Sequence, residues 1–283
     1  MESLISRANI LIEALPYIKT FFGKIIVIKY GGKAMVDEKL KHSFAQDIVL
    51  LRYIGTKPVI VHGGGLQISD VMKKMGKKVE FVNGLRTTDT ETMEIVEMVL
   101  GGRVNSEIVS LINHHGARAV GLTGVDGGLI EACETSKGSF TGQTTKIKPE
   151  IVETLDDNGF IPVIAPIGIG EDGKRYNINA DMAASEIATT LSAQKLIILT
   201  DIKGILRDIK DVNSLISTLK VEEIDTLIKD GCITEGMLPK INACKKAVSS
   251  NKVNKAHIID GRIPHSILLE LFTDEGIGTQ IIR

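Results

Sequence analysis

Short apolar runs alternate with helical patterns along most of this 283-residue chain. Runs of this kind, nearly continuous in isoleucine, valine and leucine, are typical of a mainly parallel sheet covered by helices on both faces. We therefore expect an α/β protein, with enough apolar residues for one large domain or two lobes. The predicted strands, some with their glycine turns, lie at 25–29, 58–65, 117–128, 160–168, 195–205, 255–262 and 278–283. The predicted helices lie at 37–54, 66–76, 89–113, 181–191, 221–230, 236–250 and 265–272.

Two segments depart from this alternation. Residues 129–150 are polar and rich in threonine, glycine and lysine, which predicts a β-hairpin flap. The sequence GIGEDG at 168–173 matches the dinucleotide-binding pattern G-x-G-x-x-G. No apolar helix follows it, and the pair Asp172–Gly173 favours a hairpin turn, so we interpret the match as coincidental.

An amphipathic helical pattern at residues 3–22 precedes the first strand. Pro16 lies inside this pattern and predicts that the helix kinks or breaks there. The sheet does not need this segment, so we expect the arm to dock either on its own subunit or on a neighbouring one.

The charge and cysteine content exclude several classes of protein. The formal net charge of −1 leaves no broad basic surface for nucleic acid or an acidic membrane, and only 4% of residues are aromatic. Cys133, Cys232 and Cys244 lie far apart, which argues against a disulfide framework or a zinc site and fits a reducing compartment. The sequence has no signal-peptide pattern and no apolar run long enough to span a bilayer, so we expect a cytoplasmic protein.

Two glycine turns follow predicted strands. Lys29 and the pair Gly31–Gly32 come directly after the run at 25–28, and the sequence VHGGG occupies 61–65. The carboxyl ends of parallel strands meet at one edge of a sheet, where glycine N–H groups and helix N-termini favour anions. The turns therefore predict phosphate binding. The plainer interpretation is a helix-start turn with an exposed lysine, and glycines that only relieve crowding.

Four more residues are candidates for chemistry. Asp181 opens a predicted helix and suits cationic groups or a metal, and Asn177 lies just before it. Arg86 follows the Asn83–Gly84 turn and suits a carboxylate, while Lys240 follows Pro239. Each also has a structural interpretation, as a carboxylate on a helix dipole, a surface arginine or a solvated lysine. We expect structural roles for the three histidines without metal-ligand spacing, His114, His115 and His265.

These residue types together suit phosphoryl transfer, in which a protein mainly positions its reactants and neutralises their charge. An alcohol acceptor would require a base. A carboxylate acceptor is already ionised, so the difficulty is its repulsion from the γ-phosphate. Lysines at both ends of the transferring group, glycine N–H groups and Mg²⁺ would offset that repulsion.

The motifs IKYGGKA, VIVHGGG, NGLRTTD, NINADMAA, LTDIKGI and GMLPKINAC together resemble the amino-acid kinase family. The resemblance runs from about residue 10 to the end of the sequence. It implies a three-layer αβα sandwich with a central, mainly parallel eight-stranded sheet. It also implies an arm at 1–22, a lobe at 23–192 for the acceptor, and a lobe at 193–283 for ATP, whose Mg²⁺ is held mainly by the nucleotide. Members with these motifs phosphorylate the side-chain carboxylate of N-acetyl-L-glutamate in arginine biosynthesis.

The resemblance assigns roles to individual residues. Lys29 and Lys240 would stabilise the charge on the transferring phosphoryl group, and Asp181 would hold both lysines without acting as a base. The N–H groups of Gly32 and Gly64 would bind the moving phosphate.

The same resemblance assigns residues to two binding sites. Gly64 and Gly65 would contact the acetylglutamate, Arg86 its α-carboxylate, and Asn177 would complete that pocket. The nucleotide site would be lined by Thr200, Asp201, Gly204, Gly236 and Met237.

Some members of the family are hexamers inhibited by arginine, and the N-terminal helix and the C-terminal segment of this chain are similar to theirs. In such members the arms join three dimers into a ring, and arginine binds between the arm and the C-terminal lobe. The candidate residues for that site are Tyr17, Lys220, His257, Glu270 and Gly276. Glu270 would supply the carboxylate for a guanidinium or α-amino group, unless it is simply a solvated helix residue.

Two alternatives remain at this point. A sister kinase could share the fold, although the chain is too short for the extra domains of some sister kinases. A non-catalytic arginine sensor could also share it, although such a protein would be free to lose Lys29, Asp181 and Lys240.

Overall fold

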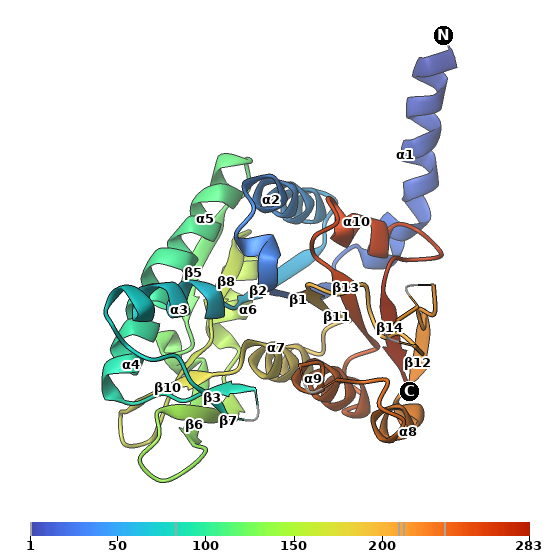
Figure 1. The fold of residues 1–283 in the computed structure, drawn as a ribbon. Coiled ribbons are helices and arrows are strands. Elements are labelled where there is room, and N and C mark those ends of the chain that lie inside the picture. The colour runs from blue at the N-terminus through green and yellow to red at the C-terminus, as the bar shows by residue number, and fades with distance from the viewer. Residues whose placement is uncertain (1, 83, 209, 212, 235) are drawn as a thin grey trace.

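The computed structural model describes residues 2–82, 84–208, 210–211, 213–234 and 236–283 (Figure 1). Its centre is an eight-stranded sheet in the order β12-β14-β13-β11-β1-β2-β8-β5. The pairs through the middle of the sheet are parallel, whereas β14 runs antiparallel to β13 at one end. The predicted mainly parallel eight-stranded sheet is therefore confirmed. The strands are β1 (Ile25–Tyr30), β2 (Lys57–His62), β5 (Ala119–Thr123), β8 (Ile161–Ala165), β11 (Lys195–Thr200), β12 (Thr218–Lys220), β13 (Lys255–Asp260) and β14 (Thr279–Ile282).

Helices cover both faces of this sheet (Figure 1). Along β1, Ile26 and Ile28 pack into one apolar core and Val27 into the other, as the period of two in a strand requires. The core on the Ile26 side includes residues of α2, α4, α5 and α10, and the core on the Val27 side includes residues of α7 and α9. The α-helices are α2 (Glu38–Tyr53), α3 (Gly65–Lys74), α4 (Thr90–Val96), α5 (Asn105–His114), α6 (Glu150–Asp157), α7 (Ala180–Thr190), α8 (Ile224–Lys229), α9 (Leu238–Ser249) and α10 (Ser266–Leu271).

Short helical turns complete the helical pattern. The predicted long helix at 89–113 is continuous, but its middle is the π-helix η2 (Glu97–Val104), which contains the Gly101–Gly102 pair. Two 3-10 turns, η1 (Gly32–Met35) and η4 (Val221–Glu223), precede α2 and α8, and a third, η3 (Asp126–Gly128), follows β5.

The polar segment forms its own small β-structure beside the main sheet. The strands β6 (Ile130–Glu134) and β7 (Thr141–Ile147) are antiparallel, which confirms the predicted hairpin. They close a four-stranded barrel with β9 (Ile167–Ile169) and β10 (Arg175–Ile178). The segment 168–173 runs from the end of β9 into the connection to the antiparallel strand β10, so the predicted hairpin turn at Asp172–Gly173 is also confirmed. The two-residue strands β3 (Phe81–Val82) and β4 (Leu85–Arg86) were not predicted, because so short a pair has no readable period.

The helix α1 (Glu2–Phe21) projects from the body of the molecule (Figure 1). It continues through Pro16, so the helix does not break there. Its last turns contact the rest of the chain: the Tyr17 hydroxyl donates to Asp274 Oδ1 at 2.6 Å, and Phe21 packs near Phe272. Its exposed apolar side chains are Leu4, Ile5, Ile10, Leu11, Ile12 and Leu15. Over the described residues, no helix combines the length and apolar character needed to cross a bilayer.

Candidate active site

The two glycine turns lie side by side at the carboxyl edge of the sheet. The strands β1 and β2 are parallel neighbours, and Tyr30 at the end of β1 pairs with His62 at the end of β2. The turns that follow are therefore brought to one place by strand register. This is the edge at which parallel α/β sheets bind their ligands.

A buried carboxylate joins the two predicted lysines. Asp181, in the first turn of α7, lies 3.0 Å from Lys29 Nζ through Oδ1 and 3.4 Å from Lys240 Nζ through Oδ2. Lys29 and Asp181 are 7% and 4% exposed, respectively. Burial opposes ionisation of Asp181, but the two ammonium groups outweigh it and hold the pKa of this carboxyl below its ordinary value. The site thus carries two positive charges around one negative charge.

A glycine and a helix cap set the geometry of this cluster. The ammonium of Lys29 is close enough for an ion pair with Asp181 Oδ1, yet it is not aligned for a hydrogen bond, and no other described residue bonds that oxygen. A side chain on Gly31 would place its Cβ 2.5 Å from Lys29 Nζ and would displace the ammonium. Asn179 accepts hydrogen bonds from the N–H groups of Asp181 and Met182, so it caps α7 and fixes the carboxylate on a helix start.

The first glycine turn is bound to the end of β11. Gly32 adopts φ +75°, and a Cβ there would overlap the carboxylate of Asp201. That carboxylate accepts from the Lys33 N–H at 2.6 Å, which closes the turn against the strand. Two residues predicted for different sites, Gly32 and Asp201, are therefore in contact.

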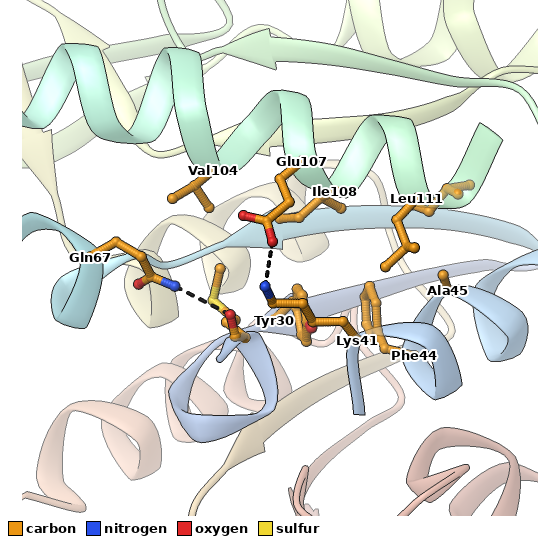
Figure 2. Close-up of a pocket in the computed structure, with 11 residues that line it drawn as sticks. Tyr30, Lys41, Phe44, Ala45, Gln67, Val104, Glu107, Ile108 and Leu111 are labelled. Atoms are coloured by element: carbon orange, nitrogen blue, oxygen red, sulfur yellow. Dashed lines mark hydrogen bonds and ion pairs between the residues drawn. The ribbon is translucent and has the colours of Figure 1, made fainter. Parts of the chain in front are cut away.

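Tyr30 supports the same turn from inside the core. Its ring stacks on Phe44 of α2 with centroids 3.7 Å apart, and its hydroxyl donates to the Ala34 carbonyl at 2.7 Å. Figure 2 shows this region, where a small cavity separates Tyr30 and Phe44 from apolar side chains of α5. An ion pair between Lys41 and Glu107 links α2 to α5 at its rim. The first turn therefore rests on a packed aromatic pair.

A cavity of about 160 Å³ opens beside the second glycine turn. It is lined by four predicted substrate-binding residues, Gly64, Gly65, Arg86 and Asn177. The guanidinium of Arg86 donates to the Gly65 carbonyl and to Ser69 Oγ, each at 2.8 Å, and is only 6% exposed. Burial lowers the pKa of Arg86, although an arginine stays cationic at neutral pH.

The polar groups of this cavity match a small anionic ligand. The Asn177 amide donates to Thr88 Oγ1 at 3.1 Å, which orients its carbonyl oxygen. The ring of Phe81 lies against the Arg86 guanidinium, with 4.8 Å from Cζ to the ring centroid. A fixed cation next to an amide suits a ligand that carries both a carboxylate and an amide.

A larger cavity of about 310 Å³ is lined by residues from the C-terminal part of the chain, between positions 201 and 262. The predicted nucleotide residues Asp201, Gly204 and Met237 line it. Thr200 is buried at the end of β11, and Gly236 is exposed next to Met237, so these two border the cavity without lining it.

This larger cavity also suits an anionic nucleotide. It brings Lys203 and Arg262 to its wall, two cations that sequence reasoning missed. Arg262 is held by Asp260 through Nε at 2.9 Å and Nη2 at 2.7 Å. The described residues contain no cluster of three His, Cys, Asp or Glu side chains suited to a metal ion. The cations on the wall of this cavity suit the phosphates of a nucleotide.

Comparison with known proteins decides the family. Residues 24–260 match the family described as "Amino acid kinase family". The chain belongs to the amino acid kinase family. A curated relative from Syntrophomonas wolfei, "Acetylglutamate kinase", is 53% identical over 284 aligned residues, which cover 99% of each chain. The predicted family is confirmed, and full-length kinase relatives at this identity bear out the prediction of an enzyme.

Solved structures agree with this family. An N-acetylglutamate synthase from Neisseria gonorrhoeae, solved with coenzyme A and N-acetyl-glutamate, has a TM-score of 0.86 and 26% identity. The match covers 98% of this kinase-family chain but only 63% of that longer chain. The same synthase with coenzyme A and L-arginine has a TM-score of 0.79 and 25% identity, over 97% of this chain and 65% of that one.

A third cavity, of about 360 Å³, lies at the opposite edge of the sheet, between α1 and the C-terminal half of this kinase-family chain. Four of the predicted arginine-site residues line it: Tyr17, His257, Glu270 and Gly276. Glu270 is buried, and its carboxylate accepts from His257 Nδ1 at 2.5 Å and from the Ile277 N–H at 2.7 Å. Burial opposes ionisation of Glu270, but these contacts outweigh it and lower the pKa of the carboxyl.

Lys220, the fifth predicted arginine-site residue, lies apart from the other four. Lys220 ends the short strand β12, where its ammonium lies 3.8 Å from Glu222, and it does not line the third cavity. Lys195 and Lys255, the first residues of β11 and β13, line the cavity instead. A lysine lines this cavity if its strand begins beside α1. The order of strands in the sheet decides this, and that order was not readable from the sequence.

Proposed function

We propose that this chain transfers the γ-phosphoryl group of ATP to the side-chain carboxylate of N-acetyl-L-glutamate. The products are ADP and N-acetyl-L-glutamyl 5-phosphate, which makes the reaction the second step of arginine biosynthesis. The observation that carries the proposal is Asp181 between Lys29 and Lys240. Asn179 and Ala180, just before Asp181, line the small cavity, and Met237, three residues before Lys240, lines the larger one. The curated relatives named acetylglutamate kinase support the choice of acceptor.

The proposed chemistry requires charge neutralisation and no general base. A carboxylate oxygen of the acceptor forms a bond to the γ-phosphorus as the bond from that phosphorus to the β–γ bridging oxygen breaks, and ADP leaves with that oxygen. Lys29 offsets negative charge near the acceptor, and Lys240 does so on the nucleotide side. Asp181 fixes the distance between the two ammonium groups. Bound Mg²⁺ supplies further neutralisation of the nucleotide phosphates.

The remaining polar groups hold the reactants. The N–H groups of Gly32 and Gly64 bind the transferring phosphoryl oxygens in this proposal. Arg86 binds the α-carboxylate of acetylglutamate, and Asn177 contacts its amide. Acetylglutamate thus lies in the lobe at 23–192, and ATP in the lobe at 193–283.

We infer, further, that arginine inhibits the enzyme by binding in the third cavity. The Glu270 carboxylate suits a guanidinium or α-amino group, and Lys195 suits the α-carboxylate of the same ligand. The structural neighbour solved with L-arginine supports this choice of ligand. The exposed apolar face of α1 supports assembly of three dimers into a hexamer through the arms. Three cysteines without disulfides fit a reducing cytoplasm.

A coupled assay of ADP release tests the proposed reaction. ADP release that requires both ATP and N-acetyl-L-glutamate is the expected result, and acetylation matters because L-glutamate carries a cation in place of the amide. Lack of ADP release with acetylglutamate and other acyl acceptors, together with arginine binding by calorimetry, would instead favour a non-catalytic sensor.

A further inference from the structure

His62 is a fully buried polar residue that the proposed chemistry does not use. It ends β2, directly before the second glycine turn, and is 0% exposed. Its Nδ1 lies 2.8 Å from the Gly63 carbonyl oxygen, and its Nε2 lies 3.1 Å from Asn105 Nδ2. Both ring nitrogens therefore have partners inside the core.

The partners of Asn105 fix which nitrogen of His62 carries the proton. Asn105 Nδ2 also lies 2.9 Å from the Val163 carbonyl oxygen and 3.3 Å from that of Leu122. Carbonyl oxygens only accept, so the atom facing them is the NH₂ group, and His62 Nε2 must accept from it. The proton then resides on Nδ1 and is donated to the Gly63 carbonyl. Burial lowers the pKa of His62 to about 4, which keeps the ring neutral.

These contacts fix the orientation of the Gly63–Gly64 peptide. The Gly63 N–H donates to the Tyr30 carbonyl at 2.8 Å, and its own carbonyl accepts from His62. The described peptide bonds are all trans, so the N–H of Gly64 points opposite to the carbonyl of Gly63. The carbonyl is bound to the core, so the N–H faces the other way, where Gly63 and Gly64 line the small cavity.

The π-helix supplies the packing for this arrangement. Asn105 begins α5 directly after η2, and Leu100 of η2 lies where a Cβ on Gly64 would overlap it. On the other side, a Cβ on Gly121 of β5 would overlap Asn105 Oδ1, so Asn105 fits only beside a glycine. Single π-turns are often found at functional sites, and here the π-turn brings a polar and an apolar contact to one glycine turn.

We propose that His62, held in its Nδ1–H tautomer by Asn105, is a positioning residue that directs the Gly64 N–H at the transferring phosphoryl group. The inference rests on the proposed function, because it assigns the Gly64 N–H a phosphoryl partner. His62 acts through the peptide and touches no reactant.

Two substitutions separate positioning from simple packing. His62→Leu removes the donor, whereas His62→Asn keeps an N–H donor near the position of Nδ1. We expect His62→Leu to lower kcat by about 10- to 100-fold, somewhat less than loss of a whole oxyanion donor, with KM for both substrates changed by less than about threefold. His62→Asn should recover most of kcat. An unchanged kcat in His62→Leu, or equal losses in both variants, would overturn the inference.

A measurement on the wild-type protein covers the case in which the variants do not fold. Imidazole ¹⁵N NMR at pH 7 should show His62 protonated on Nδ1 only, with Nε2 as the acceptor nitrogen. Protonation on Nε2 would overturn the inference whatever the kinetics show. If wild-type protein gives the expected tautomer but releases no ADP from ATP and acetylglutamate, the proposed reaction fails, and so does the phosphoryl partner assigned to Gly64. The kinetics and the spectrum therefore distinguish the two failures.

Discussion

The two edges of the central sheet differ in how their charged groups are held. At the carboxyl edge, Lys29, Asp181 and Lys240 come from β1, α7 and α9, all of which pack into the cores of the sheet. At the amino edge, Glu270 and Lys195 line a cavity that α1 closes on one side. That helix meets the body through its last turns.

This difference separates the two proposed activities physically. The proposed catalytic groups lie on elements of the folded core, so those elements cannot be deleted without disturbing the fold. The proposed arginine cavity depends on an arm that can be removed. The strands β11 and β13 connect the edges, since each starts with a cavity lysine and ends near the nucleotide cavity. Substitutions at one edge should leave the other edge nearly intact, whereas inhibition by arginine requires these strands to transmit a shift.

The largest effect is expected at the carboxyl edge. Lys29→Ala or Lys240→Ala should lower kcat by about 100-fold or more, because an electrostatic stabiliser of the transition state is lost. Steady-state assays should show this, with Lys39→Ala on the exposed surface of α2 as the control. An unchanged kcat in either variant would refute the role of that lysine.

Substitution of Arg86 should change binding more than turnover. Arg86→Ala should raise KM for N-acetyl-L-glutamate by about 10- to 100-fold while KM for ATP changes little, because a uniform binding contact is lost. The exposed Arg103→Ala serves as the control. A loss confined to kcat would mean that Arg86 acts in the transition state and not in substrate binding.

Removal of the arm should affect the amino edge of the sheet and leave the carboxyl edge unchanged. Deletion of residues 1–20 takes away Tyr17 and the exposed apolar face of α1, so hexamers should fall to dimers and arginine inhibition should weaken. The value of kcat should stay within about twofold, because no catalytic group lies in the arm. Native mass spectrometry with and without arginine tests this, and a truncated protein that stays hexameric would contradict the arm's role.

Substitutions of Lys195 and Lys220 test which of these lysines takes part in arginine binding at the amino edge. Lys195→Met should raise the arginine concentration for half inhibition by about tenfold, because a contact to the ligand carboxylate is lost. Lys220→Met should leave that concentration unchanged, since Lys220 lies outside the cavity. A larger effect of Lys220→Met than of Lys195→Met would support the sequence-based choice of Lys220 for the arginine site.

The smallest effect is a pH dependence of inhibition. Burial lowers the pKa of Lys195 to about 8, so its positive charge is present at pH 7 and lost progressively as the pH rises through 8. A carboxylate ligand binds the charged form, so the half-inhibiting arginine concentration should rise between pH 7 and pH 9. The rise should be smaller in Lys195→Met. Identical pH profiles for the two proteins would exclude Lys195 as the titrating group.

The sequence predicted the sheet well because its strands are buried on both faces and appear as continuous apolar runs. It also predicted that the two glycine turns meet at the carboxyl edge, since parallel strands bring their ends together. The expectation that Asp181 joins Lys29 and Lys240 came from the resemblance to the family, because Asp181 and Lys240 lie on helices. It could not predict β3, β4 or β12, which are two or three residues long and need partners from elsewhere in the chain. Lys203 and Arg262 were missed for a similar reason, because surface cations become a site only when the fold brings them together.

The contacts of His62 were beyond sequence analysis for another reason. A histidine before three glycines looks the same whichever nitrogen carries its proton. The choice depends on Asn105, 43 positions away, and on the carbonyls around it.

Gly121 shows that such buried contacts limit which substitutions the fold can tolerate. It lies on the edge strand β5, lines neither proposed substrate cavity, and has no side chain of its own, yet even a methyl group there would overlap the Asn105 amide. A saturation mutagenesis screen scored by growth without arginine should therefore rank Gly121 with Lys29 and Lys240. Such a screen identifies positions without space for a side chain as clearly as it identifies positions that take part in the reaction.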